Sequence, residues 1–128
     1  MSAEEGQAVD VIDFAQRSQV AQIAIGIRPR GIGFSPDSTR AYVAAEATNE
    51  VYVIDAVAFR IITRIKAGLR SNGIAVDPAG KRVYVSNGGD ASVSVIDVAS
   101  GAVTATIPVG ERPWNMALTP DGRKLYVA

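Results

Sequence analysis

The sequence contains no cysteine and no histidine among its 128 residues. Without cysteine there is no disulfide, no thiolate ligand and no thiol nucleophile, and the redox compartment stays open because cysteine-free chains occur in both settings. Without histidine the chain lacks the commonest general base and the commonest transition-metal ligand. These absences exclude a histidine-dependent triad and imidazole-bound haem or zinc, and we expect no catalytic residue, no metal and no cofactor.

A surplus of one charge and long hydrophobic runs are also missing. Thirteen Lys and Arg balance thirteen Asp and Glu. A nucleic-acid or anionic-membrane binder needs a basic face, so we expect neither partner. No apolar run is long enough to span a bilayer, and the acidic residues 1–5 are unlike a signal peptide. The length favours a single domain.

What the sequence does contain is a repeat with a period of 42 residues. The segment Val9–Asp13 recurs as Val51–Asp55 and again as Val93–Asp97. The same interval, with no insertion, relates further identical residues: Ile23, Ile65 and Ile107; Gly26, Gly68 and Gly110; Arg28, Arg70 and Arg112; Pro36, Pro78 and Pro120; and the Tyr-Val pairs at 42, 84 and 126. We therefore predict one domain over residues 3–128, with units 3–44, 45–86 and 87–128 after a two-residue leader.

Each unit carries four short strand patterns and no helical period. In the middle unit the predicted strands are 51–55, 61–67, 73–77 and 82–86. Turns that start with proline, and a hairpin turn at residues 99–101, separate such strands. Four strands in about 42 residues is the blade period of a β-propeller. The predicted fold class is all-β, a propeller of four-stranded blades.

The last unit carries a recognisable set of motifs. Tyr84-Val85-Ser86-Asn87 precedes the Val93–Asp97 strand, Ile107-Pro108-Val109-Gly110 follows, and Pro120-Asp121-Gly122 leads to Tyr126-Val127. This pattern resembles the YVTN family of β-propeller repeats, and the resemblance extends over the whole chain. The family occurs mainly in prokaryotic exported and cell-surface proteins, so the resemblance implies a periplasmic or cell-surface location. Its members share a scaffold more than an activity.

Three units cannot close a ring, because propellers have roughly four to eight blades. With strands named A to D from the axis outward, the chain reads C-D, A-B-C-D, A-B-C-D, A-B, so both ends leave β edges without partners. We predict that two chains join head to tail as a homodimer of six blades. The expected edge residues are Val9, Val11 and Ile12 on one strand and Leu125, Tyr126 and Val127 on the other. The alternative is a fragment of a longer propeller.

The candidate ligand or partner face carries the recurring arginines Arg28, Arg70 and Arg112, one per unit at the predicted channel mouth. Guanidinium groups suit carboxylates and phosphates, so these arginines could hold an anion. A residue that recurs in every blade is more simply explained as a tie between a loop and the neighbouring blade.

Residues that do not recur are the other candidates, because the scaffold does not require them. Trp114 is the sole Trp, and it lies beside Asn115, which replaces the glycine of the other units. A lone aromatic side chain on such a face is a plausible partner anchor, or it packs against a neighbouring blade. Four acidic residues are expected on the same face: Glu46, Glu50, Asp90 and Glu111. The recurring aspartates Asp13, Asp55 and Asp97 are predicted to cap turns.

These observations favour a non-enzymatic scaffold that presents a binding face to a protein or a cell-surface partner. The alternatives are a small-molecule enzyme or cofactor carrier, such as a lactonase-like hydrolase using Arg112 and Glu111, and a propeller fragment with no independent function. The fold of the resembled family hosts such chemistry.

Overall fold

The computed structural model describes residues 2–3 and 6–128, and every regular element in them is a β-strand. In chain order the strands are β1 (Ser2–Ala3), β2 (Ala8–Asp13), β3 (Ser18–Ala24), β4 (Pro29–Phe34), β5 (Arg40–Ala45), β6 (Glu50–Asp55), β7 (Arg60–Lys66), β8 (Ser71–Val76), β9 (Arg82–Asn87), β10 (Ser92–Asp97), β11 (Ala102–Pro108), β12 (Met116–Leu118) and β13 (Leu125–Val127). This part of the chain holds no helix long and apolar enough to cross a membrane. The all-β expectation is confirmed.

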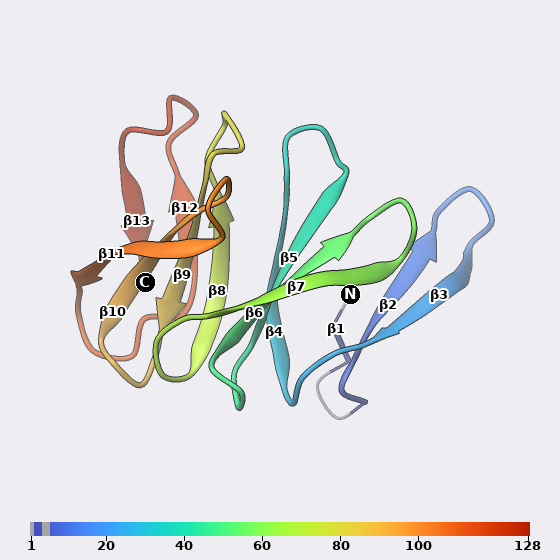
Figure 1. Ribbon diagram of the computed structural model, residues 1–128, viewed down its shortest axis with the longest axis horizontal. Coiled ribbons are helices and arrows are strands. Elements are labelled where there is room, and N and C mark those ends of the chain that lie inside the picture. Colours follow the sequence, from blue (N-terminus) through green and yellow to red (C-terminus); the bar gives the residue numbers. More distant parts are fainter. Residues whose placement is uncertain (1, 4–5) are drawn as a thin grey trace.

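The strands form four antiparallel sheets, each built from consecutive strands. Their orders are β1-β2-β3, β4-β5-β6-β7, β8-β9-β10-β11 and β12-β13, and we call these sheets the first to fourth blade. Figure 1 shows them standing side by side, with β2 and β3 at one end and β12 and β13 at the other. Two complete four-stranded blades therefore lie between two partial ones.

Strands β4, β8 and β12 are neighbours on the inner side of this arrangement. Strand β4 contacts β8, and β8 contacts β12. Glycine permits the close approach: a Cβ atom on Gly31 would lie 2.5 Å from the carbonyl oxygen of Asn72, and one on Gly73 would collide with the carbonyl oxygen of Trp114. Small residues on these inner strands therefore allow the backbones of neighbouring blades to approach closely.

Apolar side chains fill the layers between neighbouring blades. Tyr42 and Val53 of the second blade are buried with Val83 and Val85 of the third. Val9, Ile23, Val43 and Ile54 form the equivalent layer between the first and second blades. The two layers use the same repeat positions, because each blade presents one face to its predecessor and the other to its successor. Apolar burial at ~25 cal/mol per Å² is the main source of stability in such layers.

Each unit repeats the same four turns, and each turn places one residue at positive φ. The equivalent sets are Gln7, Asn49 and Ala91; Arg17, Phe59 and Gly101; Arg28, Arg70 and Arg112; and Ser38, Gly80 and Gly122. Glycine fills three of these positions and ordinary residues fill the others, at a conformational cost. The 42-residue repeat in sequence is thus also a repeat of backbone conformation.

The predicted turn caps are confirmed. The Asp55 carboxylate accepts hydrogen bonds of 2.9 Å from the backbone N–H groups of Val57 and Ala58. Asp13 and Asp97 accept equivalent bonds from Gln16 and Ser100. These aspartates stabilise the turns after β2, β6 and β10, and none of them belongs to the site described below.

The two partial blades differ from the sequence prediction in one detail. Ser2, assigned to a leader, and Ala3 form β1, which pairs with Val9 and Ala8 of β2. By the 42-residue interval, β1 occupies the place of Ala44 and Ala45 at the end of a B strand. Within the described residues, β1 pairs with the first two residues of β2 alone, and β13 pairs with β12 alone.

Candidate functional site

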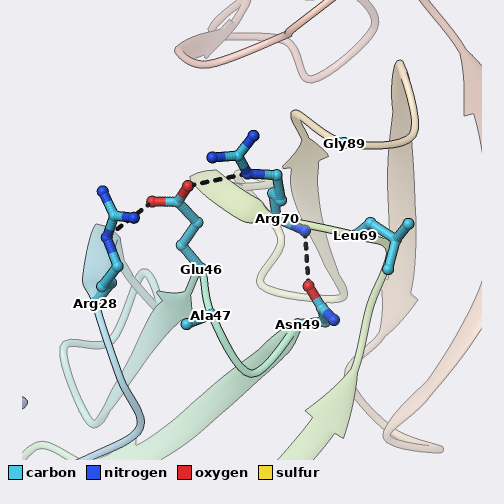
Figure 2. A pocket seen from close by; sticks show the side chains of 7 residues that line it. All are labelled: Arg28, Glu46, Ala47, Asn49, Leu69, Arg70 and Gly89. Atoms are coloured by element: carbon cyan, nitrogen blue, oxygen red, sulfur yellow. Dashed lines mark hydrogen bonds and ion pairs between the residues drawn. The ribbon is translucent and has the colours of Figure 1, made fainter.

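A hollow of about 530 Å³ opens between the second and third blades, on the face that carries the β3–β4, β5–β6 and β7–β8 connections. Figure 2 shows Arg28, Glu46, Asn49 and Arg70 among the residues around it. The placement follows from topology, since the D-to-A and B-to-C connections of successive blades meet at one end of the sheets.

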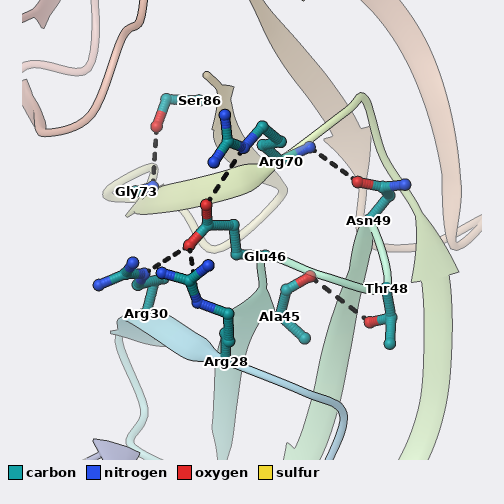
Figure 3. Close-up of polar contacts among 9 residues, drawn as sticks. All are labelled: Arg28, Arg30, Ala45, Glu46, Thr48, Asn49, Arg70, Gly73 and Ser86. Atoms are coloured by element: carbon teal, nitrogen blue, oxygen red, sulfur yellow. Dashed lines mark hydrogen bonds and ion pairs between the residues drawn. The ribbon is translucent and has the colours of Figure 1, made fainter. Parts of the chain in front are cut away.

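The carboxylate of Glu46 is the hub of this site. Arg30 Nε–H donates to Glu46 Oε2 at 2.7 Å, and Arg28 Nε lies 3.7 Å from the same oxygen. Arg70 Nε–H donates to the other oxygen, Oε1, at 3.3 Å. Figure 3 shows the three guanidinium groups converging on this one carboxylate. Glu46 thus contacts three arginine side chains at once.

Exposure differs sharply within the cluster. The Glu46 side chain is 9% exposed, whereas those of Arg28 and Arg70 are 45% and 60% exposed. Burial opposes the charged form of Glu46, but the hydrogen bond and charge of Arg30 and the charges of Arg28 and Arg70 outweigh it, so the pKa of Glu46 is lowered. Glu46 is therefore ionised at neutral pH and holds the arginines, while two of them face solvent.

Backbone contacts fix the loops that carry these side chains. The Glu46 N–H donates to the Arg28 carbonyl oxygen at 2.9 Å, and the Arg70 N–H donates to Asn49 Oδ1 at 2.7 Å. Arg28 and Arg70 both have positive φ, near 59° and 56°. Each arginine thus leaves its connection in the same direction.

The predicted structural role of the recurring arginine is confirmed for Arg70, which belongs to the third blade and bonds Glu46 of the second. The repeat also shows where this tie is missing. The position of Glu46 corresponds to Gly88 in the last unit and to Glu4 in the first, and Glu4 lies outside the described residues. Arg112 has no carboxylate at the place that Glu46 provides for Arg70.

The other predicted face residues lie apart from the Glu46 cluster. Arg112, Trp114, Asn115 and Glu111 are exposed and do not line the hollow. The Trp114 indole is 51% exposed, while the Trp114 carbonyl oxygen accepts a 2.6 Å hydrogen bond from Ser86 Oγ. Among residues 2–3 and 6–128, Arg112 makes no side-chain hydrogen bond or ion pair.

Sequence reasoning placed Glu46 on this face without recognising its central role, and it missed Arg30. Neither residue recurs in all three units, so the repeat analysis gave them no weight. The spacing of Glu46 and Arg70 could have indicated this pair. Glu46 lies in a B-to-C connection and Arg70, 24 residues later, lies in the next D-to-A connection, and these connections share one face. The part of the chain that the structure describes holds no cluster of three or more acidic residues able to bind a metal ion.

Residues 6–128 match the profile of a known protein family, which is described as lactonase, seven-bladed β-propeller. The chain belongs to this lactonase family of β-propellers. The four-stranded blades of this chain are consistent with a β-propeller family. No curated protein sequence matches the chain.

Solved structures similar to this lactonase-family chain include three that differ widely in description. Hydrazine synthase of Kuenenia stuttgartiensis is 25% identical with a TM-score of 0.92, covering 97% of this chain and 36% of that one. The dihydro-heme d1 dehydrogenase NirN, in complex with DHE, is 22% identical with a TM-score of 0.82, covering 98% and 28%. A functionally unknown protein from Desulfotomaculum acetoxidans is 17% identical with a TM-score of 0.83, covering 94% and 41%.

These likenesses concern the fold. The chain spans less than half the length of each of the three structures.

Proposed function

We propose that this lactonase-family propeller is a non-enzymatic scaffold whose loop face binds a protein or cell-surface partner that bears carboxylates. The observation that carries the proposal is the convergence of Arg28, Arg30 and Arg70 on the single buried carboxylate of Glu46. Arginine presents planar donors that match carboxylates. The Arg70 side chain is 60% exposed, so part of its guanidinium group is accessible to an acidic partner.

The chemistry of the site favours binding over catalysis. A general base works best when its pKa lies near the working pH. The pKa of Glu46 is lowered, and the chain has no histidine to take this role. Glu46 therefore acts as a positioning residue that orients the arginines.

The balanced charge of the chain, 13 basic against 13 acidic residues, supports an acidic protein or polymer over a nucleic acid. The proposed face extends from Arg28 and Arg70 toward Arg112, Glu111, Trp114 and Asn115 at the next connection. The YVTN-like motifs of the last unit support a prokaryotic exported or cell-surface setting. We further propose that all three units are of this repeat type.

Poly-L-glutamate is a suitable probe, and Trp114 provides a single tryptophan signal. We expect saturable binding that weakens as salt rises, because salt screens exposed charges. Arg70→Ala should reduce affinity by roughly 10-fold or more, the effect of one charge-assisted contact. Arg123→Ala is the matched control, since Arg123 is an exposed arginine in the β12–β13 turn, outside the cluster. Equal weakening by both variants, or no binding, would contradict the proposal.

A second candidate is hydrolysis of a lactone, which the family match favours. In that case the arginines would stabilise the oxyanion that develops when water attacks the lactone carbonyl. A pH-stat assay of δ-valerolactone and gluconolactone tests it. Saturable hydrolysis that is lost in Arg70→Ala and kept in Arg123→Ala would favour the enzyme. Hydrolysis at the uncatalysed rate by the unaltered protein and by both variants would favour the non-enzymatic scaffold.

We propose in addition that two copies complete one ring of six blades, each end of one chain completing a partial blade of the other. Six lies within the range of roughly four to eight blades in which propellers close. The family description names seven blades, so the alternative is a longer chain that supplies the remaining blades itself. That alternative corresponds to a fragment with no independent function.

A further inference from the structure

An apolar groove of about 550 Å³ lies between the first and second blades. Ile12, Ile32, Phe34, Ile54 and Phe59 are among the side chains that line it. The Phe34 side chain is 58% exposed. An open apolar groove of this size needs a covering group.

The 42-residue repeat identifies what covers the equivalent place elsewhere in the molecule. Between the second and third blades, Tyr42 of β5 is 3% exposed and packs in a cluster with Val83 and Ile96. The counterparts of Val83 and Ile96, one repeat earlier, are Ala41 and Ile54, and both line the groove. The groove is therefore a site that accepts the tyrosine of a B strand.

Such a tyrosine is available at the opposite end of the chain. Tyr126 of β13 has the same repeat position as Tyr42, and it is 65% exposed. Strand β13 pairs with β12 on one side, and its other edge has no strand partner among the described residues. Figure 1 shows β2 and β13 at opposite ends of the molecule, so they cannot meet within one chain.

Strand register supports the match. In the second blade, Ala41 and Tyr42 of β5 lie opposite Ile54 and Val53 of β6. One repeat period transfers this register to Leu125 opposite Ile12 and Tyr126 opposite Val11. Strand β1 already fills the next two places, opposite Val9 and Ala8. Leu125–Val127 of one copy and Ser2–Ala3 of the other therefore correspond to successive parts of one B strand. Ala128 has the same repeat position as Ser2, so its backbone must leave the strand to avoid Ser2 of the other copy.

We infer that a second copy of this chain seats its β12–β13 hairpin against β2, with its Tyr126 in the groove beside Ile54. The contact is head to tail, and a two-fold axis relates the two junctions of the closed pair. This inference rests on the proposed six-bladed ring and deepens it, because it assigns the residue and the register that close the ring. It is independent of the proposed carboxylate-binding face.

The first test is the mass of the 128-residue chain by light scattering after size exclusion. We expect a dimer of twice the 13.4 kDa chain mass. Tyr126→Ser should raise the dimer dissociation constant by at least 10-fold, because it removes the buried aromatic ring. Val103→Ser, on the outer strand β11, is the matched control and should leave the dimer intact. Circular dichroism verifies that each variant keeps its sheet content.

The second test uses the absence of native cysteine. Opposed residues of an antiparallel pair have Cα atoms about 4.5–5.5 Å apart, within disulfide range. The double variant Ile12→Cys, Leu125→Cys should form covalent dimers on oxidation. Ile12→Cys combined with Val103→Cys should not.

The outcomes separate the claims. A folded 13.4 kDa monomer, a trimer or an open-ended polymer would overturn both this inference and the six-bladed ring. A dimer that is insensitive to Tyr126→Ser and fails to cross-link in the Ile12–Leu125 register would overturn the inference alone. Binding of poly-L-glutamate is measured separately, so its failure would contradict the binding face without touching this contact.

Discussion

Arg70 of the third blade places its Nε 3.3 Å from Oε1 of Glu46 in the second blade, across the boundary between the two sheets. The carboxylate is almost buried and the guanidinium is mostly exposed. One residue thus anchors the pair while the other presents its charge to solvent. This ion pair links the scaffold to the proposed binding face, because the contact that ties neighbouring blades also holds the exposed guanidinium group of Arg70 on that face.

Removing the hub should destabilise the fold. Glu46→Gln leaves Arg28, Arg30 and Arg70 clustered without their carboxylate. We expect the free energy of unfolding to fall by about 1–3 kcal/mol, as for a lost charged partner at a mostly buried position. Urea denaturation measures the change. Glu111→Gln is the control at an exposed carboxylate, and an equal loss in both variants would contradict the role of Glu46.

A carboxylate supplied at Gly88 should give Arg112 the partner that Arg70 has. A Cβ atom on Gly88 would have the carbonyl oxygens of Arg70 and Pro113 as its nearest neighbours, at 3.6 Å, which is ordinary contact. Gly88→Glu should therefore raise stability over Gly88→Gln by up to about 1 kcal/mol, the range for a solvent-exposed pair. Identical urea midpoints for the two variants would show that Arg112 does not reach this position.

The sign of φ should decide how much stability is lost when each of two glycines is replaced by alanine. Gly101 has φ near 65°, Gly110 is not in that conformation, and neither would crowd a new Cβ atom. Gly101→Ala should cost roughly 1 kcal/mol, because alanine is strained in the left-handed region. Gly110→Ala should be neutral or stabilising by up to about 1 kcal/mol. Thermal unfolding of both variants checks this, and equal shifts would contradict the turn assignment.

Acid should destabilise the fold by protonating the aspartates that accept hydrogen bonds from turn residues. Asp37 accepts hydrogen bonds from Ser35 Oγ and from the N–H and Oγ1 of Thr39, which lower its pKa from 3.8 to about 2. A lowered folded-state pKa gives stability that is present above 3.8 and is lost as pH falls toward 2. The same direction holds for Asp55, Asp97 and Asp121.

Urea denaturation between pH 2 and 6 tests this expectation. Stability should fall below pH 3.8, and Asp37→Asn should reduce the pH dependence there. Asn has nearly the same shape as Asp, but its side chain does not take up a proton in this pH range. A flat profile over this range, or an unchanged slope in Asp37→Asn, would contradict the capping role.

Features that recur in every unit could be predicted from the sequence. The strand pattern, the aspartate caps and the inter-blade role of Arg70 follow from positions repeated at 42 residues. Recurrence carries this information because each blade meets the same neighbours, so one position has one physical task.

The features unique to one unit could not be predicted in the same way. Glu46 and Arg30 come together through contacts between elements, which a repeat alignment does not describe. Trp114 was expected near the channel mouth, and its carbonyl group does bond Ser86 of the third blade. Its indole nevertheless lies outside the Glu46 cluster, because Trp114 belongs to the β11–β12 connection, one blade further along the chain.

The arginine side-chain resonances report most directly on the central claim, that the Glu46 cluster is a binding site for carboxylates. Nε–Hε correlation spectra of the labelled protein can be titrated with poly-L-glutamate and assigned with single Arg→Lys variants. The account predicts saturable shifts at Arg28 and Arg70 and none at Arg123. Shifts absent from Arg28 and Arg70, or equal at Arg123, would contradict it.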